Sequence, residues 1–129
     1  MQISREEHTM ENLIIVRPEH LNHYGYLFGG QMLKWVDEFA WIAATREFPG
    51  NKFVTRAMDK IEFREAVKNG SILRFTASLE KKGSSSLSYS VGVYADEPGA
   101  VSEKYVFTTK VTLVALDESG RKAAVIDRK

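Results

Sequence analysis

Hydrophobic and polar positions follow two different periods along this chain, a helical period near the start and a strand-like period over the rest. Residues 31–48 are apolar at almost every angular position of a helix, and a Pro-Gly-Asn cluster directly follows them. Later segments alternate with period two between turn residues. In residues 72–81, Leu73 and Phe75 fall on one face and Arg74 falls on the other. The pattern predicts one long helix and several strands.

The predicted strands lie on both sides of this helix in the chain. They are residues 12–17, 53–64, 72–81, 87–95 and 101–116. Consecutive strands joined by short turns favour an antiparallel sheet, and an amphipathic sheet must bury one face. The sequence therefore predicts an α+β fold in which a five-stranded antiparallel sheet wraps one long central helix. The 129 residues contain no repeat or linker, so we expect a single domain over residues 1–129.

Composition and charge narrow the function classes. The chain has 18 Lys and Arg against 17 Asp and Glu, which argues against a broad nucleic-acid surface. It has no cysteine, so it has no disulfide, thiolate zinc site or cysteine nucleophile, and with three histidines we expect no metal centre. Asp37 and Glu38 interrupt the most apolar stretch, which predicts no membrane span. The polar N-terminus is unlike a secretory signal, so we expect a cytoplasmic protein.

Asp37 breaks the apolar pattern of the predicted helix. At 100° per residue it falls among Leu33, Ala40 and Trp41, whereas Glu38 falls in the polar sector. A carboxylate in apolar surroundings loses hydration and needs hydrogen-bond partners or a raised pKa. Asp37 is therefore either part of a functional site or a structural acid satisfied by backbone donors or an ion pair.

The start of the predicted helix is a second candidate. Gly29 and Gly30 precede it, and unpaired backbone N–H groups at a helix N-terminus can bind an anion or stabilise an oxyanion. The alternative is a simple tight turn. Asp37 lies about 10 Å along the axis from Gly30, so either a substrate spans the gap or another subunit supplies one half. Asn22, in the preceding loop, is either a turn residue or an amide that contacts substrate.

The motif formed by these residues resembles a known family. Asn-His-Tyr-Gly-Tyr-Leu-Phe-Gly-Gly over residues 22–30, with Asp37 seven residues later, resembles the hotdog-fold acyl-CoA thioesterases, the group of broad-range bacterial acyl-CoA hydrolases and their cytosolic eukaryotic relatives. Residues 54–63, the Lys-Lys-Gly-Ser-Ser-Ser turn of residues 81–86 and residues 113–117 also resemble family segments. The chain departs from the family at Ala66, where a proline is frequent, and at Lys81, where an arginine is typical.

The resemblance implies a hotdog fold and a homodimer at minimum, often a trimer of dimers, with active sites at subunit interfaces. It implies that Asp37 is the general base or nucleophile, that Asn22 orients water or the thioester, and that the backbone at Gly30 and Gln31 binds the carbonyl oxygen. Coenzyme A is then part of the substrate and product, and no separate cofactor or metal is implied. Candidate contacts to CoA or the acyl group are Gly29, Gln31, Arg64, Lys81, Lys82, Gly83, Ser85 and Ser86.

The implied activity is hydrolysis of an acyl-CoA to a free carboxylic acid and CoA. Trp35, Phe39 and Trp41 are candidates to line the acyl channel or to fill the core. One alternative is a non-enzymatic acyl-CoA sensor, which would bind the substrate without releasing thiol. A second is a hotdog dehydratase or hydratase, which is expected to use a histidine in or beside the helix; no histidine lies in or after the predicted helix here.

Overall fold

The structure is a computed structural model that describes residues 9–128. It contains the elements that the sequence pattern predicts, one long helix and five strands. In chain order they are β1 (Thr9–Ile15), the short 3-10 helix η2 (Pro18–His20), α1 (Gly29–Glu47), β2 (Lys52–Phe63), β3 (Ile72–Lys82), β4 (Ser86–Asp96) and β5 (Lys104–Leu116). The bounds of β1 differ most from the prediction: it ends at Ile15, because Pro18 starts the short helix.

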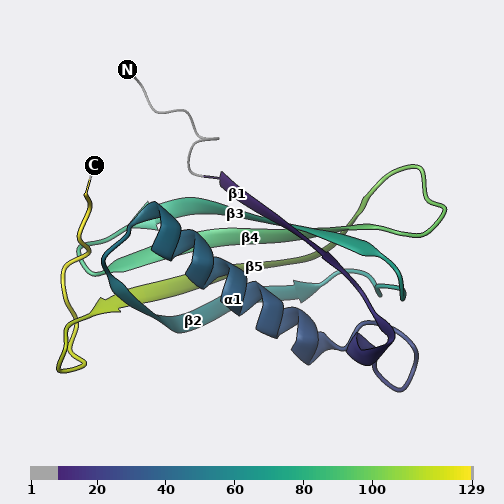
Figure 1. Ribbon diagram of the computed structural model, residues 1–129, viewed down its shortest axis with the longest axis horizontal. Coiled ribbons are helices and arrows are strands. Elements are labelled where there is room, and N and C mark those ends of the chain that lie inside the picture. The colour runs from purple at the N-terminus through teal and green to yellow at the C-terminus, as the bar shows by residue number, and fades with distance from the viewer. Residues whose placement is uncertain (1–8, 129) are drawn as a thin grey trace.

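The five strands form one antiparallel sheet in the order β1-β3-β4-β5-β2, and α1 lies across one face of it (Figure 1). Each neighbouring pair is antiparallel. The two strands that flank α1 in the chain, β1 and β2, are therefore the two edges of the sheet. No helix among residues 9–128 is long and apolar enough to cross a membrane.

The core lies between α1 and the inner face of the sheet. Leu73, Phe75 and Ala77 are fully buried while the residues between them are partly exposed, which confirms the predicted alternation. The helix buries Met32, Val36, Phe39, Ala40, Ala43 and Ala44. Because these side chains come from more than one side of α1, the sheet must curve around the helix to cover them.

The two ends of α1 lie at opposite ends of the molecule (Figure 1). The N-terminal end meets the loop of residues 16–28. A 2.9 Å hydrogen bond from Leu27 N–H to the Val67 carbonyl ties this loop to the segment after β2, and one of the same length from Phe28 N–H to the His20 carbonyl closes the loop on itself. The other end meets the C-terminal segment. There the Asn51 amide exchanges hydrogen bonds of 2.7 and 2.8 Å with the backbone of Ile126.

Candidate active site

Two backbone donors are available at the start of α1. The N–H groups of Gln31 and Met32 donate to the Phe28 carbonyl at 3.0 and 3.2 Å. Within residues 9–128, the N–H groups of Gly29 and Gly30 donate to no backbone carbonyl. A Cβ added at Gly30 would lie only 2.6 Å from the Phe28 ring, so this position has no room for a side chain without a shift of the ring. The helix start thus presents unpaired N–H groups beside a glycine surface.

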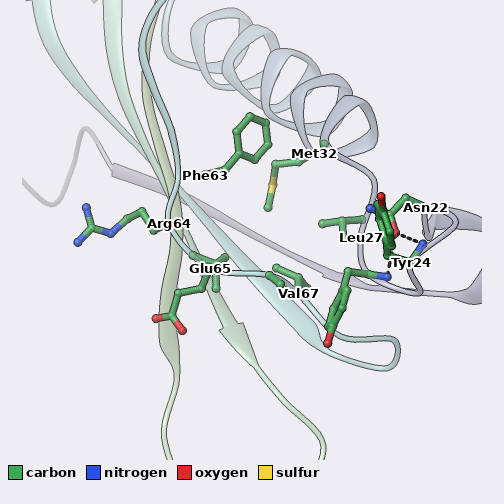
Figure 2. Close-up of a pocket in the computed structure, with 12 residues that line it drawn as sticks. Asn22, Tyr24, Leu27, Met32, Phe63, Arg64, Glu65 and Val67 are labelled. Carbon is green, nitrogen blue, oxygen red and sulfur yellow. Dashed lines mark hydrogen bonds between the residues drawn. The ribbon is translucent and has the colours of Figure 1, made fainter.

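Asn22 uses one end of its amide in the loop and keeps the other end available. Its Oδ1 accepts hydrogen bonds from the N–H groups of Tyr24 at 2.9 Å and Tyr26 at 3.2 Å, drawn as dashed lines in Figure 2. Two backbone donors converge on one atom, so that atom is the oxygen. Among the described residues, Nδ2 has no hydrogen-bond partner. Asn22 is therefore both a turn residue and a side chain that can donate, but not accept, at a site.

Asn22 and Gly29 line the same cavity, which has a volume of about 570 Å³. Figure 2 shows that it lies between the loop, the start of α1 and the segment that follows β2. The other lining residues are mostly apolar: Tyr24, Tyr26, Leu27, Met32, Phe63, Arg64, Glu65, Ala66, Val67 and Val106. A mostly apolar cavity with a few polar donors is typical of a site for a small organic molecule.

The guanidinium group of Arg64 points away from this cavity (Figure 2). Its Cζ lies 4.7 Å from the centre of the Tyr105 ring, and its Nη1 lies 3.1 Å from Glu62 Oε1. Arg64 is therefore held on the outer side of the sheet in this chain. Any contact with a substrate phosphate would be made outside the cavity.

Asp37 is half-buried and has the hydrogen-bond partner that its position requires. Thr55 Oγ1 donates to Asp37 Oδ1 at 2.5 Å. The two residues line a second hollow of about 480 Å³ together with Glu38, Trp41 and Ile42. Trp41 is held in place because its indole N–H donates to the Phe53 carbonyl at 3.1 Å. One oxygen of the Asp37 carboxylate is thus engaged by Thr55, and Oδ2 has no hydrogen-bond partner among residues 9–128.

Thr55 is the site residue that sequence reasoning missed. It faces α1 from β2, on the same side of the strand as the buried Phe53. A polar residue at an inward-facing strand position was the available signal, because Thr55 lies two residues after Phe53 with no register shift between them.

The fold brings the predicted residues together in three separate groups. Asn22, Gly29, Gly30 and Gln31 meet at the start of α1, whereas Asp37 lies in the second hollow, which shares no lining residue with the first. The turn of residues 81–86 is a third group, in which β4 and β5 lie between Lys82 and Thr55. Lys81 and Lys82 there have no ion-pair partner within residues 9–128. A single chain therefore does not assemble the predicted site.

The aromatic residues of α1 divide between core and site. Phe39 is buried, and its ring centre lies 6.0 Å from that of Phe75; Trp35 packs edge-on against Phe75 at 6.2 Å. These two residues fill the core. Trp41 is 45% exposed and lines the hollow beside Asp37. The His20 ring packs against Trp35, and residues 9–128 contain no group of three side chains able to hold a metal ion.

A family model described as the thioesterase superfamily matches residues 24–102, which is more than half of the chain. The chain belongs to the thioesterase superfamily. Among curated proteins it is 32% identical over 101 residues to the mouse acyl-coenzyme A thioesterase 11, covering 78% of this chain but 17% of that protein. The chain thus spans about a sixth of the length of this thioesterase superfamily relative.

Solved structures of the superfamily share the fold. An acyl-CoA hydrolase from Staphylococcus aureus, in complex with butyryl coenzyme A, coenzyme A and coenzyme A disulfide, is 28% identical with a TM-score of 0.84, covering 95% of this chain and 74% of that one. A hexameric hotdog fold thioesterase of Campylobacter jejuni is 32% identical with a TM-score of 0.77, covering 88% and 87%. The arrangement of one helix against five antiparallel strands is therefore the hotdog fold.

The Staphylococcus aureus enzyme has also been prepared as variants in which an asparagine, an aspartate or a threonine is replaced by alanine. Its asparagine precedes its aspartate by fifteen positions. Asn22 precedes Asp37 by the same number of positions in this chain. The spacing of the two candidate residues is thus shared with that enzyme.

Proposed function

We propose that this protein is an acyl-CoA thioesterase that hydrolyses an acyl-CoA to a free carboxylic acid and CoA. The observation that carries the proposal is that two complementary half-sites lie beside one free sheet edge. One half-site offers the N–H donors of Asn22 and Gly30, and the other offers the carboxylate of Asp37 held by Thr55. The names of the relatives support the same activity.

A homodimer joined along β2 would unite the two half-sites. β2 is an edge strand that pairs only with β5 among the described residues 9–128, and it exposes Val54, Ile61 and Phe63. Thr55 lies near its start and Phe63 at its end, both on the face toward α1. A two-fold axis midway between them would pair the strands antiparallel and place Asp37 of one protomer against the cavity of its partner.

The 81–86 turn fits a larger assembly. Within one chain, β4 and β5 lie between Lys82 and Thr55, so the cations of the turn reach the site only from another copy. A trimer of such dimers, the assembly implied by the resemblance, would supply that copy, and the Campylobacter jejuni relative is hexameric. In that arrangement Lys81, Lys82, Gly83, Ser85 and Ser86 contact the CoA phosphates or pantetheine, and Lys81 acts as a point charge.

The chemistry follows from which atoms are free. Asn22 Nδ2 and the Gly30 N–H donate to the thioester carbonyl oxygen and to the oxyanion that develops on it. Asp37 either takes a proton from the attacking water or attacks the carbonyl itself. If Asp37 acts as base, the tetrahedral intermediate collapses, the carbon–sulfur bond breaks, and the CoA thiolate takes up the proton that Asp37 removed from water. If Asp37 attacks directly, loss of the thiolate leaves a mixed anhydride on Asp37, and water then hydrolyses this anhydride to the free carboxylic acid while the thiolate takes up a proton of that water. The Gln31 N–H can contribute only by sharing the hydrogen that it donates to Phe28.

The test is thiol release from a series of acyl-CoAs from acetyl to palmitoyl. We expect activity in the wild type and a loss of about 100-fold or more in Asp37→Asn, the usual range for removal of a general base. Glu38→Gln is the matched control, because Glu38 is the neighbouring carboxylate in the same hollow but faces solvent. No thiol release from any acyl-CoA would refute the proposal, and tight acyl-CoA binding without release would favour a sensor.

A further inference from the structure

The cavity beside Asn22 and Gly29 is closed on the side of the sheet by one aromatic ring. Phe63, the last residue of β2, lies between the start of α1 and β5. A Cβ added at Gly29 would lie 3.4 Å from Phe63 Cε1 and Cζ, so the ring packs directly against the helix start. The cavity continues past it along Met32, Leu27 and Val67, whose side chains surround it in Figure 2.

The Phe63 ring is supported from behind. It packs edge-on against the fully buried Phe107, with ring centres 5.1 Å apart. Edge-to-face aromatic pairs are stabilising, so this contact favours the present orientation of the ring. Phe63 is 55% exposed in the single chain, and it lines the cavity next to the donors proposed to hold the thioester carbonyl.

A β-bulge points Phe63 inward. The register of β2 against β5 shifts twice: a first shift, between Thr55 and Ala57, places Met58 opposite the buried Val111, and a second, between Asp59 and Glu62, places Phe63 opposite Phe107 on the inner face. Side chains alternate with period two, so in a strand with the first shift but without the second, Glu62 would face inward and Phe63 would face solvent. The bulge is built by Lys60, which has φ of 53°, and its freed Asp59 carbonyl accepts a 2.7 Å hydrogen bond from the buried Thr109 hydroxyl.

The local cost of this bulge suggests a role for the residue that it turns inward. The left-handed conformation of Lys60 costs about 1 to 2 kcal/mol, because the residue is not glycine. The buried Thr109 hydroxyl is used to satisfy the Asp59 carbonyl. As a result the ring of Phe63, and not the carboxylate of Glu62, lies against the apolar cavity. We propose, resting on the thioesterase function above, that Phe63 is the specificity-determining residue that limits the length of the acyl chain.

The experiment compares chain-length profiles of kcat/KM for the wild type, Phe63→Leu and Phe63→Ala in the thiol-release assay. Removing the ring extends the cavity along β5, so the optimum moves to longer acyl chains. Each further methylene that becomes buried raises kcat/KM for the longer substrate about fourfold, the transfer free energy of one methylene converted at 25 °C. Gly29→Ala should move the optimum to shorter chains, because its methyl group fills space next to the ring at an ordinary contact distance.

Ile72→Ala is the control, since Ile72 is an exposed apolar residue on the outer face of β3. It should leave the profile unchanged. Phe63→Leu keeps an apolar side chain, so it tests the same inference if Phe63→Ala fails to fold. Thermal unfolding of both variants shows whether each is folded. An equal fall in kcat/KM at every chain length in both Phe63 variants would overturn this inference while leaving the thioesterase function intact. Absence of activity in the wild type would instead refute the function itself.

Discussion

Replacing Thr55 by valine removes one hydroxyl group and keeps the branched shape of the side chain. In the structure that hydroxyl donates to Asp37 Oδ1 at 2.5 Å. The bond holds one carboxylate oxygen, so the other oxygen keeps a defined direction for water or the thioester carbon. Thr55→Val should therefore lower the rate of the chemical step and leave substrate binding almost unchanged.

The size of the effect follows from the kind of bond and its surroundings. Hydrogen bonds to charged groups contribute about 1.5 to 3 kcal/mol. Thr55 is exposed in the single chain, so the lower end of this range applies. A loss of about 1.5 kcal/mol in transition-state stabilisation corresponds to about a tenfold fall in kcat.

The assay is a double-mutant cycle of Thr55→Val and Asp37→Asn, with kcat and KM measured by thiol release. Because Thr55 acts through Asp37, Thr55→Val should cost about tenfold in the wild type and almost nothing in the Asp37→Asn background. Thr76→Val is the control, since the Thr76 hydroxyl contacts the Gly92 carbonyl on the outer face of the sheet. Equal losses in both backgrounds, or a rise in KM at constant kcat, would refute this role of Thr55.

Three further predictions concern the helix start, the core and the C-terminal segment. Gly30→Ala would place a Cβ 2.6 Å from the Phe28 ring and should lower kcat/KM about tenfold or more, so full activity would show that the thioester does not approach this position closely. Tyr89→Phe removes a 2.6 Å hydrogen bond to Glu47 and should lower the free energy of unfolding in urea by about 2 kcal/mol. Burial, and then the hydrogen bond to Glu47, raise the pKa of Tyr89 far above the ordinary value of about 10. Above pH 10 the unfolded chain loses this proton and the folded chain keeps it, so wild-type stability should fall with pH more steeply than that of Tyr89→Phe, and parallel curves would contradict the assignment. Asn51→Ala removes two hydrogen bonds to the C-terminal segment and should raise amide exchange there at least about tenfold, whereas unchanged protection would show that other contacts hold the segment.

The sequence pattern was a good guide to the elements, because each depends on local periodicity. The alternation around Leu73 and Phe75 predicted the buried face of β3, and the Pro-Gly-Asn cluster marked the end of α1. The pattern was a poorer guide to the middle of β2. Each of its two register shifts adds one residue, so Met58 lies opposite the buried Val111 although counting in twos from Phe53 would turn it outward. Thr55 precedes both shifts, and the two shifts cancel before Phe63, so both keep the inward side of Phe53.

The sequence indicated which residues could take part in a site, but not which residues they contact. Asp37 was found because a carboxylate on an apolar helix face conflicts with its surroundings, and its partner Thr55 became visible only when β2 was placed beside α1. For Asn22 the sequence left a turn role and a binding role open. The structure shows how one side chain does the first and remains able to do the second, because its oxygen and its nitrogen point to different partners.

The sequence by itself determined the α+β class with one long helix and five strands, the exclusion of cysteine chemistry, and the two unusual features at Gly29-Gly30 and Asp37. These follow from composition and local periodicity, which need no knowledge of distant contacts. Only the tertiary structure decided that β2 is a free edge, that Thr55 holds Asp37, and that Phe63 lines the cavity beside Asn22 and Gly29. These features depend on which strands pair and in what register, and pairing joins residues far apart in the chain whose contacts local pattern does not encode.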